Sequence, residues 1–471
     1  MARKTGMLPY SVEVVDDDAG ITAYAGLPLV IETMRSLGVS ELLDKELGIR
    51  QRNHGATDAQ KAEAVVLLMA AGGTCVSDVA KLRSDKGLLR LVGYALPSEQ
   101  VLWNFFNAFH DDALLEEAQA RLPPDAVAYI PGENAPLRAL GRANVALAHA
   151  VATRNGLTRA TLDYDATVIE SHKEEAKAHC ERNVRGRGYQ PAVIYFVEAD
   201  QVIGDEFRDG NVPAGMKNLR LIQHGFASLP ATIKERFFRA DSASYDQEVL
   251  RWLADESRQD GPAGFIGFSI SADMTKELRD ACEALPESAW TRIEDRAHET
   301  VFAADVEFVS GTWPKHAQPL RYVAVRFVGT QLDLDGKVPV KHLAVVSNRR
   351  DMTAAQLLRW HWAKAGTIEH VHNVVKNELG GGSLPSGRFG ANAAWFRFAL
   401  LTYNVLSALK LFALPPSMET ARPKRLRFAL FTLAARITSH AGAIVMKIGR
   451  HANELADFVA SRLRLAQLST A

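Results

Sequence analysis

Hydrophobic residues recur every three or four positions through the first 155 residues, which is the spacing of helices with one buried face. The clearest segment, 57–73, begins with Thr57, a favoured helix cap, and ends in a pair of glycines. Further helices are predicted over 27–48, 76–93, 97–110 and 141–156. Such a run of short helices is typical of a DNA-binding region of the helix-turn-helix kind and, equally, of a plain helical bundle.

The pattern changes at residue 159, where β-branched and aromatic residues bounded by turn residues predict strands. The first of these segments is "RATLDYDATV", 159–168. Strands over 191–199, 201–210, 236–241 and 263–272 follow, with helices over 214–230, 244–257 and 275–286. The order of three strands, helix, strand, helix and strand predicts an α/β core with a mixed sheet.

Residues 288–348 show a third pattern, a β-rich patch with hairpin turns. A long helix is predicted after it, over 353–382, because apolar positions keep helical spacing until a run of glycines. The expected organisation is therefore a helical N-terminal region, 1–155; a core in two parts, 156–287 and 349–412; a β-rich insertion between these parts, 288–348; and a C-terminal helical region, 413–471.

Composition is that of a soluble globular protein. Of 471 residues, 47% are hydrophobic and 23% are charged, and 55 basic residues balance 55 acidic ones. The apolar run 62–73 is too short to cross a bilayer, so no membrane partner is expected. Three separated cysteines form no disulfide framework, which indicates a reducing compartment. Basic clusters at 49–54, 181–189 and 422–427 leave DNA binding open.

Three acidic residues stand out by their placement. Asp165 lies near the end of the first core strand, Asp241 directly follows a later strand, and Glu369 lies inside the long helix. Residues spaced three or four apart predict one face of that helix, made of Leu358, Trp362, Ala365, Glu369, His372 and Lys376. A glutamate on a partly apolar face is expected to point inward. With two strand-end aspartates, it can hold two divalent metal ions through oxygen ligands, which Mg²⁺ prefers.

Each acidic residue also has a structural explanation. Strand-end aspartates are common turn formers and helix caps, so Asp241 could cap the helix over 244–257. Glu369 could pair with Lys376 on the same helix. Asp163 precedes Asp165 by two residues and points from the same strand face, which makes it the rival metal ligand.

The contexts "LDYDATV", "FFRADSASY" and "GTIEHVHNVVKNEL", together with the β-rich insertion, resemble bacterial insertion-sequence DDE transposases. The likeness covers nearly the whole chain and is greatest to the insertion-sequence thirteen-eighty family. It implies a ribonuclease-H-like mixed-sheet core with a β-strand insertion before the catalytic glutamate. The helical regions at both ends of the chain would flank this core.

The resemblance assigns roles residue by residue. It implies that Asp165, Asp241 and Glu369 are the catalytic metal ligands and that Lys376 neutralises a phosphate near the cut. The family pattern also has a Tyr and an Arg that contact a DNA-end phosphate. This sequence has Trp362 and Ala365 in their places, and Lys364 or Arg359 could supply the missing charge.

What the resemblance implies is a DNA transposase that cuts transposon ends and joins the 3′ ends to target DNA. It would use two Mg²⁺ ions, for which Mn²⁺ can substitute. Region 1–155 would bind terminal inverted repeats, and the protein would act as a homodimer on DNA in the bacterial cytoplasm, associated with the nucleoid. Trp290 and Trp313 are candidates to stack on a flipped base. The alternatives are a catalytically inactive DNA-binding derivative and a metal-dependent nuclease without strand transfer.

Overall fold

The computed structural model describes residues 20–126, 128–180, 185–331, 338–449 and 455–468. The chain divides into two compact units, which are described separately: Met1–Phe106 with Ala408–Ala471, and Asn107–Ser407. These units do not follow the predicted domain boundaries. The residues from 107 to 155 belong with the α/β core, whereas the C-terminal segment folds with the N-terminal helices.

The first unit contains a group of helices at the N-terminal end of the chain. They are α1 (Pro28–Ser36), α2 (Val39–Glu46), α3 (Asp58–Ala71), α4 (Val79–Arg83), α5 (Lys86–Val92) and α6 (Glu99–Asn107). α3 is almost completely buried, and Thr57 and Gln60 cap its first turn reciprocally. The C-terminal α16 (Leu455–Leu468) packs on α1, where Ser36 donates a hydrogen bond to the Leu465 carbonyl.

A small antiparallel sheet in this unit joins both ends of the chain. Its strands are β1 (Ile21–Thr22), β14 (Ala435–His440) and β15 (Ala443–Ile448), in the order β1-β14-β15. The prediction that residues 413–471 are helical is therefore wrong for this hairpin. β-Branched residues favour strands here, and Ala441 and Gly442 both adopt positive φ, as a two-residue hairpin turn requires. Helical α15 (Pro423–Leu426) continues into a π-helical turn, Arg427–Phe431.

The second unit is built on a nine-stranded sheet with the order β10-β11-β12-β13-β9-β8-β2-β6-β7. The core strands are β2 (Arg159–Ala166), β6 (Ala192–Phe196), β7 (Gln201–Glu206), β8 (Glu235–Ala240) and β9 (Ile266–Ser271). β2, β6 and β7 are antiparallel neighbours, while β8 and β9 run parallel to β2. This mixed sheet with its first strand at the centre is the predicted ribonuclease-H-like core, so the fold class is confirmed.

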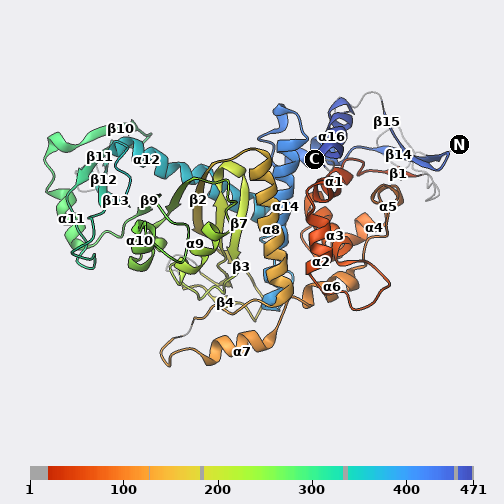
Figure 1. The fold of residues 1–471 in the computed structure, drawn as a ribbon, viewed down its shortest axis with the longest axis horizontal. Helices are drawn as coiled ribbons and strands as arrows, with labels where there is room; N and C mark the ends of the chain where they lie inside the picture. Colours follow the sequence, from red (N-terminus) through yellow and green to blue (C-terminus); the bar gives the residue numbers. More distant parts are fainter. Residues whose placement is uncertain (1–19, 127, 181–184, 332–337, 450–454, 469–471) are drawn as a thin grey trace. The chain divides into compact units, whose positions relative to one another are not determined.

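The β-rich insertion continues the same sheet. Its strands are β10 (Thr291–Asp295), β11 (Glu299–Val306), β12 (Arg321–Gly329) and β13 (Val340–Ser347). All four are antiparallel to their neighbours, and β13 pairs directly with β9. Figure 1 shows these strands extending from the core on the side away from α8 (Ala135–Arg154). The insertion is therefore an extension of the core sheet.

Helices and a small second sheet complete this unit. The other helices are α7 (Asp112–Ala120), α9 (Asn218–Ala227), α10 (Gln247–Ala254), α11 (Lys276–Glu283), α12 (Ala354–Trp362), α13 (Ile368–Glu378) and α14 (Phe389–Phe412), whose last residues belong to the first unit. The small sheet contains β3 (Ile169–Glu170), β5 (Arg187–Tyr189) and β4 (Lys177–Ala178). α14 is fastened to the core because Asn404 exchanges hydrogen bonds with the backbone of Val202.

Among the described residues, no single helix has the length and apolar character to cross a membrane. α3 and segment Val76–Arg83 meet that test only together, as a pair bent by 93°.

Candidate active site

β2 presents two aspartates on one face, and the first of them is part of a buried ion pair. Asp163 is fully buried and accepts hydrogen bonds from Nε and Nη2 of Arg239 at 2.7 and 2.8 Å. Arg239 lies directly opposite it on the parallel strand β8. The Thr367 hydroxyl also donates to Asp163. These partners occupy the carboxylate of the predicted rival ligand.

Asp165 has a different environment two residues further along β2. Its side chain is 15% exposed, Lys364 Nζ lies 3.5 Å from Oδ1, and His372 Nε2 lies 3.7 Å from Oδ2. Burial raises the pKa of the Asp165 carboxyl to about 6. The Lys364 ammonium opposes this rise, whereas the negative charges of Asp241 and Glu369 add to it. Asp165 therefore experiences the charge of both other predicted carboxylates.

Asp241 follows the carboxyl end of β8, beside β2. It is partly buried, and its Oδ1 accepts a hydrogen bond from the Ala243 N–H at 3.1 Å. This bond caps the short 3₁₀ turn Ser242–Ser244. The alternative explanation, that Asp241 caps the helix over 244–257, is wrong, because α10 is capped by Asp246. Among the described residues, no hydrogen bond to the second carboxylate oxygen of Asp241 is found.

Glu369 lies in the first turn of α13 and is exposed, so the prediction that it points inward is wrong. The long helix predicted over 353–382 is broken: α12 ends at Trp362, and a 3₁₀ turn, Ala363–Gly366, precedes α13. Thr367 leaves the helical region with φ −109° and ψ −87°, and its hydroxyl bonds to Asp163. The predicted single helix face is therefore wrong across the break.

Within α13, spacing still aligns Glu369 with His372 and Lys376. His372 is buried, and its pKa is lowered to about 3 by burial and by the positive charges of Lys364 and Lys376, so the imidazole is neutral. Its Nε2 has no hydrogen-bond partner among the described residues, although it faces Asp165. A buried nitrogen without a partner beside a carboxylate marks a place for an additional ligand.

Lys376 reaches the end of β2. Its Nζ donates to the Val168 carbonyl at 2.7 Å and lies 3.2 Å from the Thr167 hydroxyl, and burial lowers its pKa. It therefore binds the chain after β2, and a salt bridge to Glu369 is not found among the described residues. Lys376 also lines a cavity of about 760 Å³ with Glu170 and Arg185.

The candidate metal ligands do not form a closed coordination shell in this structure. Among the described residues, no three Asp, Glu, His or Cys side chains lie close enough together to hold one metal ion. The chemistry of the donors nevertheless suits a hard divalent cation, because Asp165, Asp241 and Glu369 supply carboxylate oxygens. Burial raises the pKa of Asp165, and the negative charges of Asp241 and Glu369 raise it further. Lys364 is the cation that partly offsets this charge here.

The other predicted DNA-contacting residues lie elsewhere in the unit. Arg359 is exposed on α12 and donates to the Ile293 carbonyl at 3.2 Å, whereas Lys364 is buried against Asp165. Trp362 packs on the insertion, with the Arg296 guanidinium 5.2 Å from its ring centroid. Ala365 is exposed in the 3₁₀ turn. Trp362 ends α12, and Ala365 lies in the 3₁₀ turn that follows it, before the break at Thr367.

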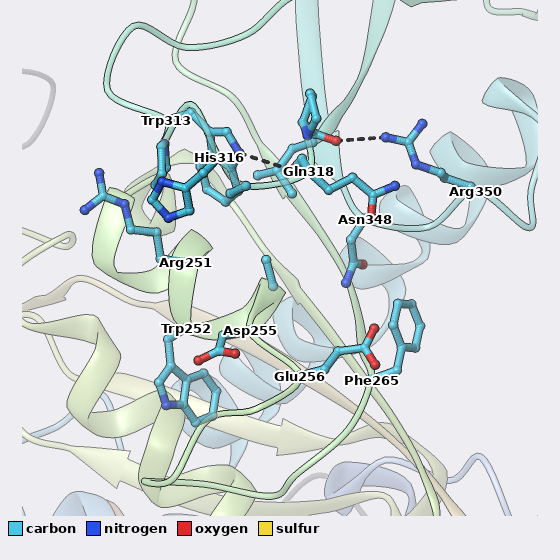
Figure 2. A pocket seen from close by; sticks show the side chains of 15 residues that line it. Arg251, Trp252, Asp255, Glu256, Phe265, Trp313, His316, Gln318, Asn348 and Arg350 are labelled. Atoms are coloured by element: carbon cyan, nitrogen blue, oxygen red, sulfur yellow. Dashed lines mark hydrogen bonds between the residues drawn. The ribbon is translucent and has the colours of Figure 1, made fainter.

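Trp290 is partly buried, with the Arg326 guanidinium 4.5 Å from its ring centroid and the His342 ring at 5.7 Å. Trp313 is 8% exposed, and its indole N–H donates to the Gln318 carbonyl. Figure 2 shows Trp313 and His316 on one wall of a cavity of about 520 Å³. The insertion thus uses both tryptophans in packing, and Trp313 also lines a cavity.

The arrangement of strand-end carboxylates on this core agrees with a comparison against protein families. The family described as "Transposase DDE domain group 1" matches residues 8–470. The chain belongs to this family. It is a DNA transposase of the DDE class, and enzymes of this class use divalent metal ions.

Curated proteins and solved structures provide two further comparisons for this transposase. No curated protein matches the chain. Among solved structures, the chain is similar to piggyBac transposase in a cryo-EM synaptic complex with hairpin DNA, at 9% sequence identity and a TM-score of 0.45. The similarity covers 87% of this chain and 80% of that one.

Several contacts near the carboxylates of this transposase were not expected from sequence. Arg239 neutralises Asp163, Thr367 ties the helix break to that pair, and His372 faces Asp165. The position of Arg239 two residues before Asp241, inside an apolar strand, was an available signal. A buried arginine on a core strand needs a carboxylate partner.

Proposed function

We propose that this transposase cuts the ends of an insertion sequence and joins the released 3′ ends to target DNA at a site formed by Asp165, Asp241 and Glu369. The supporting observation is the environment of Asp165. This carboxylate lies at the end of the central strand, its pKa is raised to about 6, and it experiences the negative charges of the other two. Perturbed carboxylates of this kind gather at catalytic sites.

The three carboxylates would hold two Mg²⁺ ions, for which Mn²⁺ can substitute. When bound, such a pair supplies positive charge to the attacking and leaving oxygens of a phosphoryl transfer. The chain's own residues then have separate tasks. Asp163 and Arg239 fix β2 against β8, and Thr367 holds the helix break beside them, which positions Glu369 at the start of α13.

Two lysines act on charge in this proposal. Lys364 neutralises Asp165 while the carboxylates are free of metal. Lys376, at the end of β2, neutralises a phosphate of the bound strand next to the cut. Arg359, exposed on α12, is a further candidate for a phosphate contact.

Within the DDE transposases, we assign this protein to the insertion-sequence thirteen-eighty family. The partners would be terminal inverted repeats and target DNA, with a homodimer holding two ends in the bacterial cytoplasm, at the nucleoid. The helices at the N-terminal end would read the repeats. Because these helices fold with residues 408–471, the whole first unit is the entity to test for repeat binding.

Strand transfer by a purified protein, with a labelled element end and a plasmid target, tests the proposal. Asp165→Asn, Asp241→Asn and Glu369→Gln should each lower cutting and joining on the order of a thousandfold or more, because these side chains are proposed to act as one unit. Glu235→Gln is the matched control, because Glu235 lies exposed at the opposite end of β8 from Asp241.

The alternatives give different products in that assay. Cutting without joined product would identify a nuclease, and end binding without cutting would identify an inactive DNA-binding derivative. Wild-type activity in the Asp165→Asn protein would remove the proposed site.

For Trp290 and Trp313 the proposal is stacking on a flipped base at the cut. Alanine substitution at the tryptophan that stacks should leave first-strand nicking near normal and slow hairpin formation, since stacking contributes about 1–3 kcal/mol per base. Circular dichroism checks that the fold is intact. Equal rates for all steps in both variants would assign these tryptophans to packing alone.

A further inference from the structure

The β14–β15 hairpin of the first unit carries an unusual distribution of charge. Residues 420–449 contain six basic residues and no acidic residue. Two of these basic residues, Arg436 and Lys447, lie on the hairpin and are exposed. They are directly opposite each other in the strand register. Like charges in this position destabilise a hairpin, so a face that keeps them together is suited to an anionic partner.

The two faces of the hairpin differ sharply. Ala435 and Ile437 are buried in a small core, and Met446 and Ile448 pack against it from β15. The opposite face presents the basic pair in its first part, with Thr438 opposite Val445 further along. No carboxylate of the described residues forms an ion pair with either member of the basic pair. The hairpin is therefore anchored by one face. The other face exposes the basic pair, with Thr438 and Val445 further along and Ile21 of β1 beside Arg436.

From this geometry we infer that the outer face of β14–β15 contacts the sugar–phosphate backbone of DNA. The inference rests on the proposed function only in taking DNA as the partner. Two adjacent basic side chains on an exposed sheet face can meet phosphate oxygens, which receive half or more of the hydrogen bonds between proteins and DNA. Because phosphate contacts carry no sequence information, this face adds affinity for any duplex and does not select the element ends.

A second copy of the chain is the competing occupant, because β15 is an edge strand and exposed edges can pair with one another. Charge argues against it. A symmetric pairing of two β15 strands would bring together two faces that are both basic, with Lys447 of each copy on the joined surface. DNA is the partner whose charge complements this face.

The test measures binding of the full-length protein to labelled duplexes in EDTA. Fluorescence anisotropy gives the affinity at several salt concentrations. The variant is Arg436→Gln with Lys447→Gln. The matched control is Lys234→Gln with Lys276→Gln, which removes the same charge from exposed sites in the second unit. Lys234 precedes β8, at the end of that strand away from Asp241.

The hairpin variant should bind on the order of tenfold more weakly, equally for element-end and random duplexes. The slope of log K against log salt should fall by about 1.8, which is 0.9 for each phosphate that the variant no longer neutralises. The control should match the wild type. The charge-conserving swap Arg436→Lys with Lys447→Arg should also bind normally, which guards against loss of fold as the cause.

Two results would overturn the inference. One is an affinity and salt slope unchanged in the hairpin variant. The other is a lower molar mass of the hairpin variant than of the wild type in the absence of DNA, measured by light scattering. That result would make this face an interface between copies. The Asp165→Asn protein should bind DNA normally in EDTA. If Asp165→Asn fails to transfer strands but binds DNA, and only the hairpin variant loses binding, the catalytic proposal and this one are tested separately.

Discussion

Asp163 and Asp165 lie two residues apart on the same face of β2, but their surroundings differ in almost every respect. Asp163 is fully buried and neutralised by Arg239 with two hydrogen bonds. Asp165 lies near the strand end beside a lysine and a neutral histidine, and the negative charges of two further carboxylates act on it. The first aspartate completes the structure of the core, and the second is left with negative charge that the protein does not fully neutralise.

The difference shows how a short distance along one strand separates structural from chemical roles. A buried charge requires a complete set of partners, because removing one partner leaves the other charge uncompensated. A carboxylate at a strand end can keep an incomplete set, since water reaches it. An incomplete set leaves room for a substrate or a metal ion.

The largest effect is expected at Asp163. Asp163→Asn leaves the Arg239 guanidinium buried without its counter-charge, which should lower the free energy of unfolding by about 3–5 kcal/mol. Urea denaturation of the purified protein measures this, with Glu235→Gln as the control. A loss below about 1 kcal/mol would mean that the two aspartates are not as different as their contacts indicate.

The opposite sign is expected at Asp165. Its folded pKa, about 6, is raised above the ordinary 3.8, so the folded state holds the proton more tightly and stability falls as pH rises from about 4 to about 6. Asp165→Asn cannot ionise. In EDTA it should therefore exceed the wild type by an amount on the order of 2–3 kcal/mol above pH 6, and the difference should shrink toward pH 4. Denaturation curves at several pH values test this, and a wild type that gains stability over this window would contradict it.

A smaller effect is expected from Lys364. Lys364→Met removes the cation nearest Asp165, so it should lower stability in EDTA and raise the affinity for Mn²⁺ about tenfold, because the ion no longer meets a positive charge. Isothermal titration of Mn²⁺ and the melting shift with added metal give the two readouts. Lys234→Met serves as control. Weaker metal binding in Lys364→Met would show that this lysine supports the site in another way.

The smallest effect concerns the link between Asp163 and the helix break before Glu369. Thr367→Val deletes the hydroxyl that joins Asp163 to the helix break, which should lower stability by about 1 kcal/mol. If the break positions Glu369, strand transfer should also slow while DNA binding stays the same. The control is Thr353→Val, at the exposed cap of α12. It should lower the free energy of unfolding by a similar amount and leave the rates of strand transfer and DNA binding unchanged.

Much of the core was predictable from local pattern. The strands around Asp165 and Asp241 follow from β-branched runs bounded by turn residues. Acidic residues at the ends of such apolar strands are easily noticed, so both aspartates could be proposed as site residues. The helix break before Glu369 was not predictable, because it depends on Thr367 contacting Asp163 across more than two hundred residues. The β14–β15 hairpin was missed because its amphipathic stretch also fits a helical period, and pairing with β1 decides the outcome.

The pairing of β1 with β14 has a consequence for synthesis. Ile21 pairs with Arg436, so the first unit cannot close until nearly the whole chain has left the ribosome. At about 5–20 residues per second this delay is roughly 20–80 s. During that time α1 lacks α16 as cover, and α3 lacks the π-helical turn Arg427–Phe431. The helices made first are therefore among the last to be completed, and chaperones that shield exposed apolar surface should increase the yield of this protein more than that of one with sequential domains.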